Sequence, residues 1–253
     1  IDNLFRYVEN ADFETVDPDT TWPASWIINP QVSTEYNLIS GTDSRGNIME
    51  IDRPISTVSG HWAFMQQANV ALVDGCSSLI LSDEVQPMNQ SLNSPGYSQG
   101  EFPIHIRIVY EDADAQRHTY QLGVYYAGDD VSSYTVPSNG CASHLGTCNV
   151  FQTFKVAQNE WFTLPSIDLM ALTPVPHKLI GFRLGSSGHT FKGRFDNVQL
   201  TGSDAADMVK DAMDWRWVGA NYMGGESSVP VNWDLEGWTE LQSTLIDFKE
   251  NNL

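Results

Sequence analysis

Positive charge is scarce in this sequence. Thirteen Lys and Arg residues stand against 32 Asp and Glu residues in a chain of 253, a formal net charge of −19 at pH 7. Such a surface repels phosphate backbones and anionic membranes, so nucleic-acid binding is not expected. The acidity agrees with solubility in a salty or extracellular setting. The alternative is an affinity for divalent cations, because hard oxygen ligands are abundant.

Long apolar runs are also missing. None approaches the roughly 20 residues that a membrane helix needs, so no membrane span is expected in this chain. The chain begins at Ile1 without an initiator Met or a signal-peptide pattern, which is typical of a mature or excised piece. Hydrophobic residues make up 41% of the sequence, enough for a sizeable core.

Cysteine is sparse, with three residues in all. Cys141 and Cys148 flank a short Ser/Gly/His/Thr loop, and their spacing allows a small disulfide. A zinc site from this pair and His144 is the weaker alternative, because no fourth ligand is apparent. Cys76 is left over and is expected to be a buried, inert thiol. A disulfide favours an extracellular, cell-surface or periplasmic location.

Sequence motifs of enzymes are lacking as well. The chain has no Gly-x-Ser-x-Gly, no His-Glu-x-x-His and no phosphate-cradling glycine loop, and its six histidines are scattered. An enzyme is therefore not expected. A polysaccharide-degrading enzyme remains the alternative, because 32 acidic residues supply many accidental carboxylate pairs.

What the sequence does contain is a series of short β-strands. Apolar residues alternate from Phe102 to Tyr110 and again from Thr119 to Tyr126, which predicts a hairpin with one apolar face. Further strands are predicted at 150–156, 178–184 and 191–200, and a polar loop at 86–100. Many short strands spaced by about ten residues indicate an all-β sandwich.

The residue pattern changes from that of strands to that of helices after residue 202. Residues 203–213 begin with capping residues and have helical spacing, and 234–249 form an amphipathic pattern. We expect a partly helical C-terminal extension or linker over 203–253. Its tryptophans would mark a partner surface if they are exposed, or core if they are buried: Trp215, Trp217, Trp233 and Trp238.

Three motifs occur in order along the rest of the chain. They are Asn-Ala-Asp-Phe-Glu at 10–14 followed by Trp22, Glu-Trp-Phe-Thr-Leu at 160–164 followed by Ile-Asp-Leu, and Phe-Asp-Asn-Val-Gln-Leu at 195–200. Together they resemble the galactose-binding-like jelly rolls of bacterial carbohydrate-binding modules over about residues 5–202. The resemblance implies a two-sheet antiparallel jelly-roll β-sandwich, assigned here to residues 1–202.

The resemblance also implies a structural calcium ion. Glu14 and Asp196 would hold it, with Asn10 or Asp12 adding oxygen atoms and backbone carbonyls completing the six to eight ligands that calcium prefers. The plain alternative is that these are ordinary loop carboxylates near strand ends.

A sugar presents an apolar C–H face and a polar rim, so its site needs aromatic rings and planar polar groups. The outward side of the predicted hairpin offers His105, Arg107, Gln121 and Tyr125, and Trp62 is a further candidate. Core packing is the alternative for each aromatic residue.

These observations favour a non-catalytic, calcium-braced carbohydrate-recognition module of a secreted or cell-surface protein. The alternative is an interaction or sensory ectodomain, or an assembly domain of a larger membrane receptor, channel or filament, which contacts a protein partner through the C-terminal extension.

Overall fold

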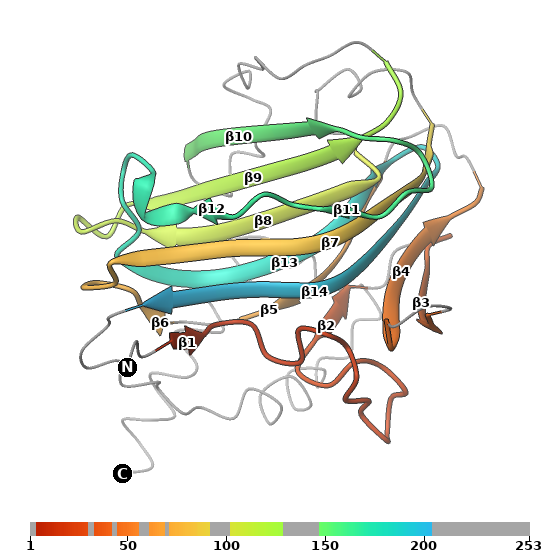
Figure 1. Ribbon diagram of the computed structural model, residues 1–253, viewed down its shortest axis with the longest axis horizontal. Coiled ribbons are helices and arrows are strands. Elements are labelled where there is room, and N and C mark those ends of the chain that lie inside the picture. The colour runs from red at the N-terminus through yellow and green to blue at the C-terminus, as the bar shows by residue number, and fades with distance from the viewer. Residues whose placement is uncertain are drawn as a thin grey trace, which may run out of the picture.

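The computed structural model describes residues 4–29, 33–41, 45–55, 61–68, 71–91, 102–128 and 147–203. Strands dominate these residues (Figure 1). In chain order they are β1 (Leu4–Arg6), β2 (Ile27–Asn29), β3 (Glu35–Ser40), β4 (Asn47–Arg53), β5 (His61–Gln67), β6 (Ala71–Leu72), β7 (Ser78–Gln90), β8 (Ile104–Glu111), β9 (Arg117–Tyr125), β10 (Thr147–Lys155), β11 (Phe162–Thr163), β12 (Ile167–Asp168), β13 (Lys178–Gly188) and β14 (Phe191–Ser203). A short 3₁₀ turn, η2 (Leu169–Ala171), follows β12.

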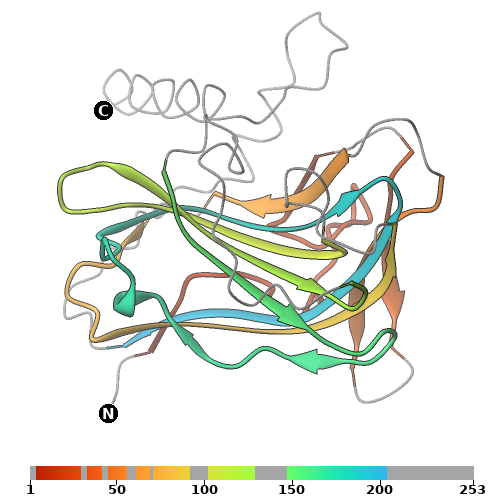
Figure 2. The same cartoon turned by 90° about the horizontal axis from the view of Figure 1, so that it is seen from above.

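The strands form two sheets that lie face to face (Figure 2). The first, called the β14 sheet, has the order β11-β7-β14-β4-β3, with β1 paired to β14 and β12 to β7. The second, called the β8 sheet, has the order β10-β9-β8-β13-β5-β2, with β6 paired to β13. All pairs are antiparallel except β9 and β10, which run parallel. The predicted jelly-roll β-sandwich is confirmed.

The core lies between the two sheets and follows the strand period of two. In β8 the inward side chains are Ile104, Ile106, Ile108 and Tyr110, all fully buried. They belong to the same cluster as inward residues of the β14 sheet: Met49, Ile51, Leu79, Leu81, Val85, Phe191 and Phe195. Alternate residues of β8 therefore point to the opposite, outer face of their sheet.

The predicted hairpin is confirmed as β8 and β9, with Ile104 opposite Val124 and Glu111 opposite Arg117. The predicted loop at 86–100 is wrong at its start, because β7 continues to Gln90. These last residues pair with β14 (Gln90 opposite Phe191), and that pairing is too distant in sequence for a local turn pattern to reveal.

Several predictions fall on residues outside the described ones. The helical extension after Ser203 and its four tryptophans stay predictions, and so do the protein-partner surface and the domain boundary that depend on them. Cys141 also lies outside, and the side chain of Cys148 is not described, so the disulfide stays a prediction. Cys76 is buried and free, as expected. No helix among the described residues is long and apolar enough to cross a membrane.

The first and last described strands are neighbours. β1 pairs antiparallel with the end of β14, with Leu4 opposite Ser203 and Arg6 opposite Thr201. The Tyr7 amide continues this pairing by donating to the Leu200 carbonyl at 2.8 Å. The first and last described segments of the chain thus lie side by side in the β14 sheet (Figure 1).

Candidate functional site

The outer face of the β8 sheet carries polar and aromatic side chains from four neighbouring strands. Strand register places Arg107 of β8 between Gln121 of β9 and Arg183 of β13. On the far side of β13, Gln66 of β5 is the partner of Arg183. Four strands, of which only β8 and β9 are neighbours in sequence, thus contribute one row of planar polar groups to one face.

Aromatic rings lie beside this row. The His105 ring meets the Trp62 ring edge to face, with centroids 4.8 Å apart. The Arg107 guanidinium lies 3.8 Å from the centre of the Trp62 ring, and that of Arg183 lies 4.7 Å from the centre of the Phe64 ring. These two cation–π pairs hold both guanidiniums at defined places on the face.

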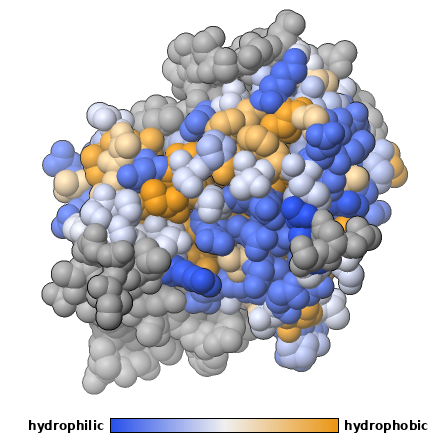
Figure 3. Space-filling view, in the orientation of Figure 1, coloured by the Kyte–Doolittle hydropathy of each residue, from blue (hydrophilic) through white to orange (hydrophobic). Residues whose placement is uncertain are grey.

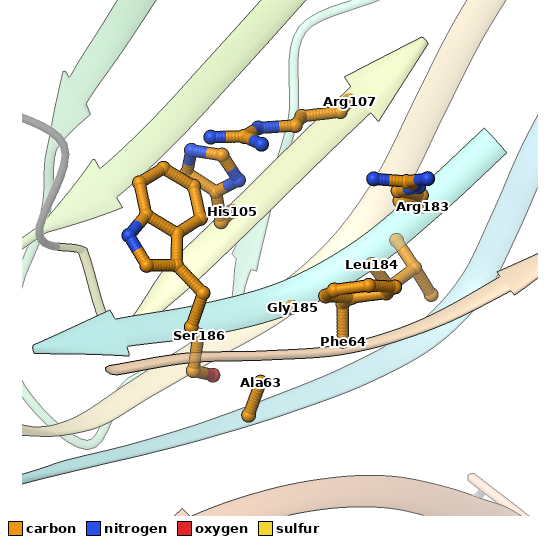
Figure 4. Close-up of a pocket in the computed structure, with 9 residues that line it drawn as sticks. Ala63, Phe64, His105, Arg107, Arg183, Leu184, Gly185 and Ser186 are labelled. Atoms are coloured by element: carbon orange, nitrogen blue, oxygen red, sulfur yellow. The ribbon is translucent and has the colours of Figure 1, made fainter. Parts of the chain in front are cut away.

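A small pocket opens between these pairs (Figure 4). Its lining includes Trp62, Phe64, His105, Arg107 and Arg183. In the close-up, His105 and Arg107 lie together on one side, while Arg183 lies above Phe64 on the other. Trp62 and Phe64 are half-buried, so they are the partly exposed aromatic residues of the lining.

Two glycines flank His105 in the strand register. Gly123 and Gly185 are its register partners on the two neighbouring strands. A Cβ atom at Gly123 would lie 2.7 Å from the Phe102 ring, and one at Gly185 would lie 2.4 Å from the Ala63 carbonyl oxygen. A larger residue would therefore collide with the Phe102 ring at the first position and with the backbone of Ala63 at the second.

The sequence placed its four hairpin candidates on a solvent-facing side, and the structure corrects this. His105 is 3% exposed and Arg107 8%, and Gln121 and Tyr125 are also buried. They do lie on the outer face, opposite the core, as their alternation indicated. The period of a strand tells which face a side chain occupies, but not whether that face is open to water.

Several polar atoms of this face have no hydrogen-bond partner. They are Nε2 of His105, Nε of Arg107, and both the amide oxygen and the amide nitrogen of Gln66, which is 0% exposed. A buried polar group without a partner costs about 1–3 kcal/mol. Such groups are rare in native proteins, and each calls for an explanation such as a ligand.

The electrostatics of the face are equally unusual. Burial lowers the pKa of His105 well below its usual range, and the positive charge of Arg107 lowers it further. Burial also lowers the pKa of Arg107 well below its usual range, with repulsion from Arg183 as the second cause. His105 is therefore a neutral imidazole at neutral pH, able to donate from one nitrogen and accept at the other.

Three residues of the site were missed by sequence reasoning: Phe64, Gln66 and Arg183. Phe64 and Gln66 follow Trp62 at steps of two, so the strand period would have placed all three on one face. Arg183 alternates with the core residues Phe182 and Leu184, which is the same signal. Their meeting with β8 depends on sheet order, which local patterns do not show.

The residues expected to hold calcium lie near the start of β4 and the bulge of β14. Asn10 is committed to its own loop: its amide donates to the Thr15 and Ala24 carbonyls at 2.8 and 3.0 Å and accepts from the Thr15 amide at 2.9 Å. Asp12 is exposed and accepts from the Glu14 amide at 3.4 Å. Glu14 accepts from the backbone amide of Asn47.

Asp196 lies close to other acidic groups. It is 2% exposed, and burial raises its pKa to about 6, with Glu84 and Glu14 contributing and Arg45 opposing. The Arg45 Nε lies 3.3 Å from a Glu84 oxygen and 3.7 Å from an Asp196 oxygen. The positive charge of Arg45 thus partly compensates the negative charges of Glu84 and Asp196.

Asp83 is a further member that the sequence analysis missed. It lies on the same face of β7 as the core residues Leu79, Leu81 and Val85, it is 1% exposed, and both its carboxyl oxygens lack a hydrogen-bond partner. Burial raises its pKa well above the usual range, and the charges of Asp196 and Glu84 raise it further.

These groups bear on calcium in two ways. Among the described residues, no three or more His, Cys, Asp or Glu side chains come together in an arrangement that could hold a metal ion. The orphaned oxygens of Asp83 beside Asp196 are nevertheless the kind of donors that calcium takes. Asn10, whose amide is fully engaged, does not fit as a side-chain ligand, and calcium binding stays a prediction.

The outer face of the β14 sheet provides a contrast. Its long cations are paired: Arg194 Nε lies 2.7 Å from Glu50, and Lys192 Nζ lies 2.9 Å from Asp52 and 3.1 Å from Glu50. In the space-filling view, hydrophilic side chains gather over the middle and right of the face seen in Figure 1 (Figure 3). The positive charges of Arg194 and Lys192 are thus neutralised in place on this outer face.

Comparison with known proteins finds similarity to solved structures. No protein-family model matches the chain, and no curated protein matches it. One similar structure is the family 11 carbohydrate-binding module of the cellulosomal cellulase Lic26A-Cel5E of Clostridium thermocellum. Its identity is 14% and its TM-score 0.38, over 76% of this chain and 92% of that one.

Two other similar structures illustrate the range. CBM61 in complex with β-1,4-galactotriose has 9% identity and a TM-score of 0.40, over 78% of this chain and 97% of that one. The arabinose-bound α-L-arabinofuranosidase MgGH51 has 11% identity and a TM-score of 0.39, over 78% of this chain and 26% of that one. This similarity concerns the fold, and the function has to be argued from the site residues themselves.

Proposed function

We propose that the chain is a non-catalytic carbohydrate-recognition module and that the outer face of the β8 sheet is its binding site. One observation carries the proposal. Buried polar atoms of Gln66, His105 and Arg107 lack partners on a face that also presents the rings of Trp62 and Phe64.

The chemistry of this face matches a sugar ring. A pyranose offers C–H bonds on one side, which stack on an aromatic ring, and hydroxyl groups around its rim, which both donate and accept. Gln66 and neutral His105 can each donate and accept, while Arg107 only donates. Ring hydroxyls of either hydrogen-bonding polarity would thus find a partner.

The site favours binding over hydrolysis. Glycoside hydrolysis uses two carboxyl groups that flank the scissile bond. The described residues that line the pocket include no Asp or Glu. Neutral His105 is the remaining candidate for acid–base chemistry, and it lacks an orienting carboxylate among these lining residues.

The test is a glycan array probed with the intact chain, followed by calorimetry on each positive glycan. Trp62→Ala should abolish binding. The matched control is Trp161→Ala, because Trp161 is also half-buried and lies 4.4 Å from a guanidinium, that of Arg45, outside the proposed site. Equal loss of binding in both variants, or no binding to any glycan, would contradict the proposal.

We also propose that calcium, when bound, stabilises the fold near Asp196. Asp196 and Asp83 would supply carboxylate oxygens, with Glu84 and Glu14 close by and backbone carbonyls making up the remainder. An ion that binds only the folded state raises its stability by mass action. Because polysaccharides are met outside cells, we propose an extracellular, cell-surface or periplasmic location.

A further inference from the structure

We propose that residues 204–253 pack across the outer face of the β8 sheet as a third layer of the fold. This inference goes beyond carbohydrate recognition, because it concerns what covers the face and not what the face binds. The observation that carries it is the burial of side chains on a face over which no described element lies.

The outer face is almost completely shielded from water. Its outward residues on three adjacent strands are at most 8% exposed: Thr119, Gln121 and Tyr125 on β9, His105, Arg107 and Val109 on β8, and Arg183 on β13. These exposed fractions are those of the single chain. The atoms that cover the face therefore belong to this chain.

Packing in the core does not account for this burial. The described strands all belong to the two sheets, and the β14 sheet lies on the inner side of the β8 sheet (Figure 2). Val109 and Tyr125 are buried apolar residues that do not belong to the core cluster between the sheets. Among the described elements, none forms a layer on their side. The cover therefore comes from a segment outside the described residues.

Residues 204–253 are the longest such segment and the most suitable in composition. They number 50, against 18 for residues 129–146 and ten for residues 92–101. They contain four of the eight tryptophans of the chain and the amphipathic pattern at 234–249. Burial of an apolar side chain such as Val109 needs apolar partners, which this segment supplies in larger number than 129–146.

The end of β14 places the start of this segment beside the β8 sheet. The Ser203 carbonyl accepts from the Ser77 amide at 3.0 Å. Residues 73–77 connect β6 of the β8 sheet to β7, and the Val73 amide donates to the His177 carbonyl, just before β13, at 2.9 Å. Four neighbouring strands span roughly 15 Å, which an extended segment of this length exceeds several times over. The segment can therefore reach all of the buried strands.

Charge favours the same arrangement. The segment carries ten Asp and Glu residues against three Lys and Arg residues. The described residues that line the pocket on this face include Arg107 and Arg183 and no Asp or Glu. Carboxylates beside guanidiniums form charge-assisted hydrogen bonds, which are roughly twice as strong as neutral ones.

The cover is incomplete at β5. Trp62 and Phe64 are half-buried, whereas His105 and Arg107 on β8 and Arg183 on β13 are buried. We therefore place the border of the third layer beside these two rings, next to the pocket.

The test is photo-crosslinking on the full chain. Phe64→p-benzoylphenylalanine should crosslink to peptides from 204–253, which mass spectrometry of digests identifies. The matched control replaces Trp161, which is also half-buried but lies beside Arg45, an ion-pair partner of Glu84 in the β14 sheet, and it should give no such crosslink. Crosslinks from position 64 to 129–146, to 92–101 or to a second copy alone, equal yields at both positions, or no crosslink would overturn the inference.

A second measurement uses the native chain and so does not depend on the folding of a variant. In hydroxyl-radical footprinting, Trp238 should be oxidised more slowly than half-buried Trp161 and at a rate near that of Trp26, which is 6% exposed in the core. Oxidation of Trp238 as fast as Trp161 or faster would overturn the inference. Neither experiment uses a glycan, so failure of every glycan to bind would overturn the proposed function alone.

Discussion

The guanidinium of Arg107 lies 3.8 Å from the centre of the Trp62 ring, and the same ring meets His105 edge to face. Trp62 thus contacts a charged and a neutral polar group at once, from two positions of β8 that are one strand period apart. Because both contacts fix the indole, the aromatic platform of the site is formed before any ligand arrives, and little side-chain entropy remains to be lost on binding.

Replacing Gln66 should change stability and binding in opposite directions. Both amide atoms of Gln66 are buried without a partner. Gln66→Leu removes this desolvated group and should stabilise the free protein by roughly 1–3 kcal/mol in urea denaturation, while weakening glycan binding. A core residue of purely structural importance would not show this reversal, so a destabilised Gln66→Leu that binds normally contradicts the assigned role.

Acid should destabilise the protein through His105. Its folded pKa lies well below the ordinary value of 6.5, so below pH 6.5 the unfolded chain binds a proton that the folded chain does not. Stability is therefore fully present above pH 6.5 and falls as the pH drops further, by up to about 1.4 kcal/mol per pH unit. Denaturation series between pH 7.5 and 5 on wild type and His105→Gln should differ by this slope. Parallel profiles would show that His105 titrates alike in both states.

Calcium should reverse the effect of Asp83→Asn on melting. With chelator, the variant should melt at or above the temperature of wild type, because a carboxyl group whose charged form is disfavoured by burial is replaced by an amide that cannot ionise. With calcium, wild type should gain stability that the variant lacks. Asp112→Asn serves as the control, since Asp112 belongs to the β8–β9 turn and pairs with His118 at 2.6 Å. If calcium shifts neither wild type nor variant, the calcium proposal is wrong.

Much of the fold follows from strand periodicity alone. The β8–β9 hairpin was predictable because Ile104, Ile106 and Ile108 alternate with polar residues and a turn separates two matching patterns. The same period also marks Asp83 as inward-facing among Leu79, Leu81 and Val85, a signal that was overlooked. An acidic residue on the apolar face of a strand indicates a buried charge or a ligand site, as Asp83 does here.

The site itself was only half predictable. His105, Arg107, Gln121 and Tyr125 belong to one local hairpin, so their shared face could be inferred. Arg183 and Gln66 join them because β13 inserts between β8 and β5. Sheet order of this kind arises from long-range packing of the sandwich, and a short stretch of sequence does not predict it. Burial of the face likewise depends on tertiary structure.

The pairing of β1 with the end of β14 has a mechanical consequence. Leu4 and Ser203 are register partners in an antiparallel pair, so a pull applied at these two residues would draw the strands apart from one end. The backbone hydrogen bonds between β1 and β14 would then break one after another, because the force would act on one bond at a time. Under tension the sandwich would open first at this seam, at low force, while the β8 sheet on the other side of the core stayed intact and able to hold its ligand.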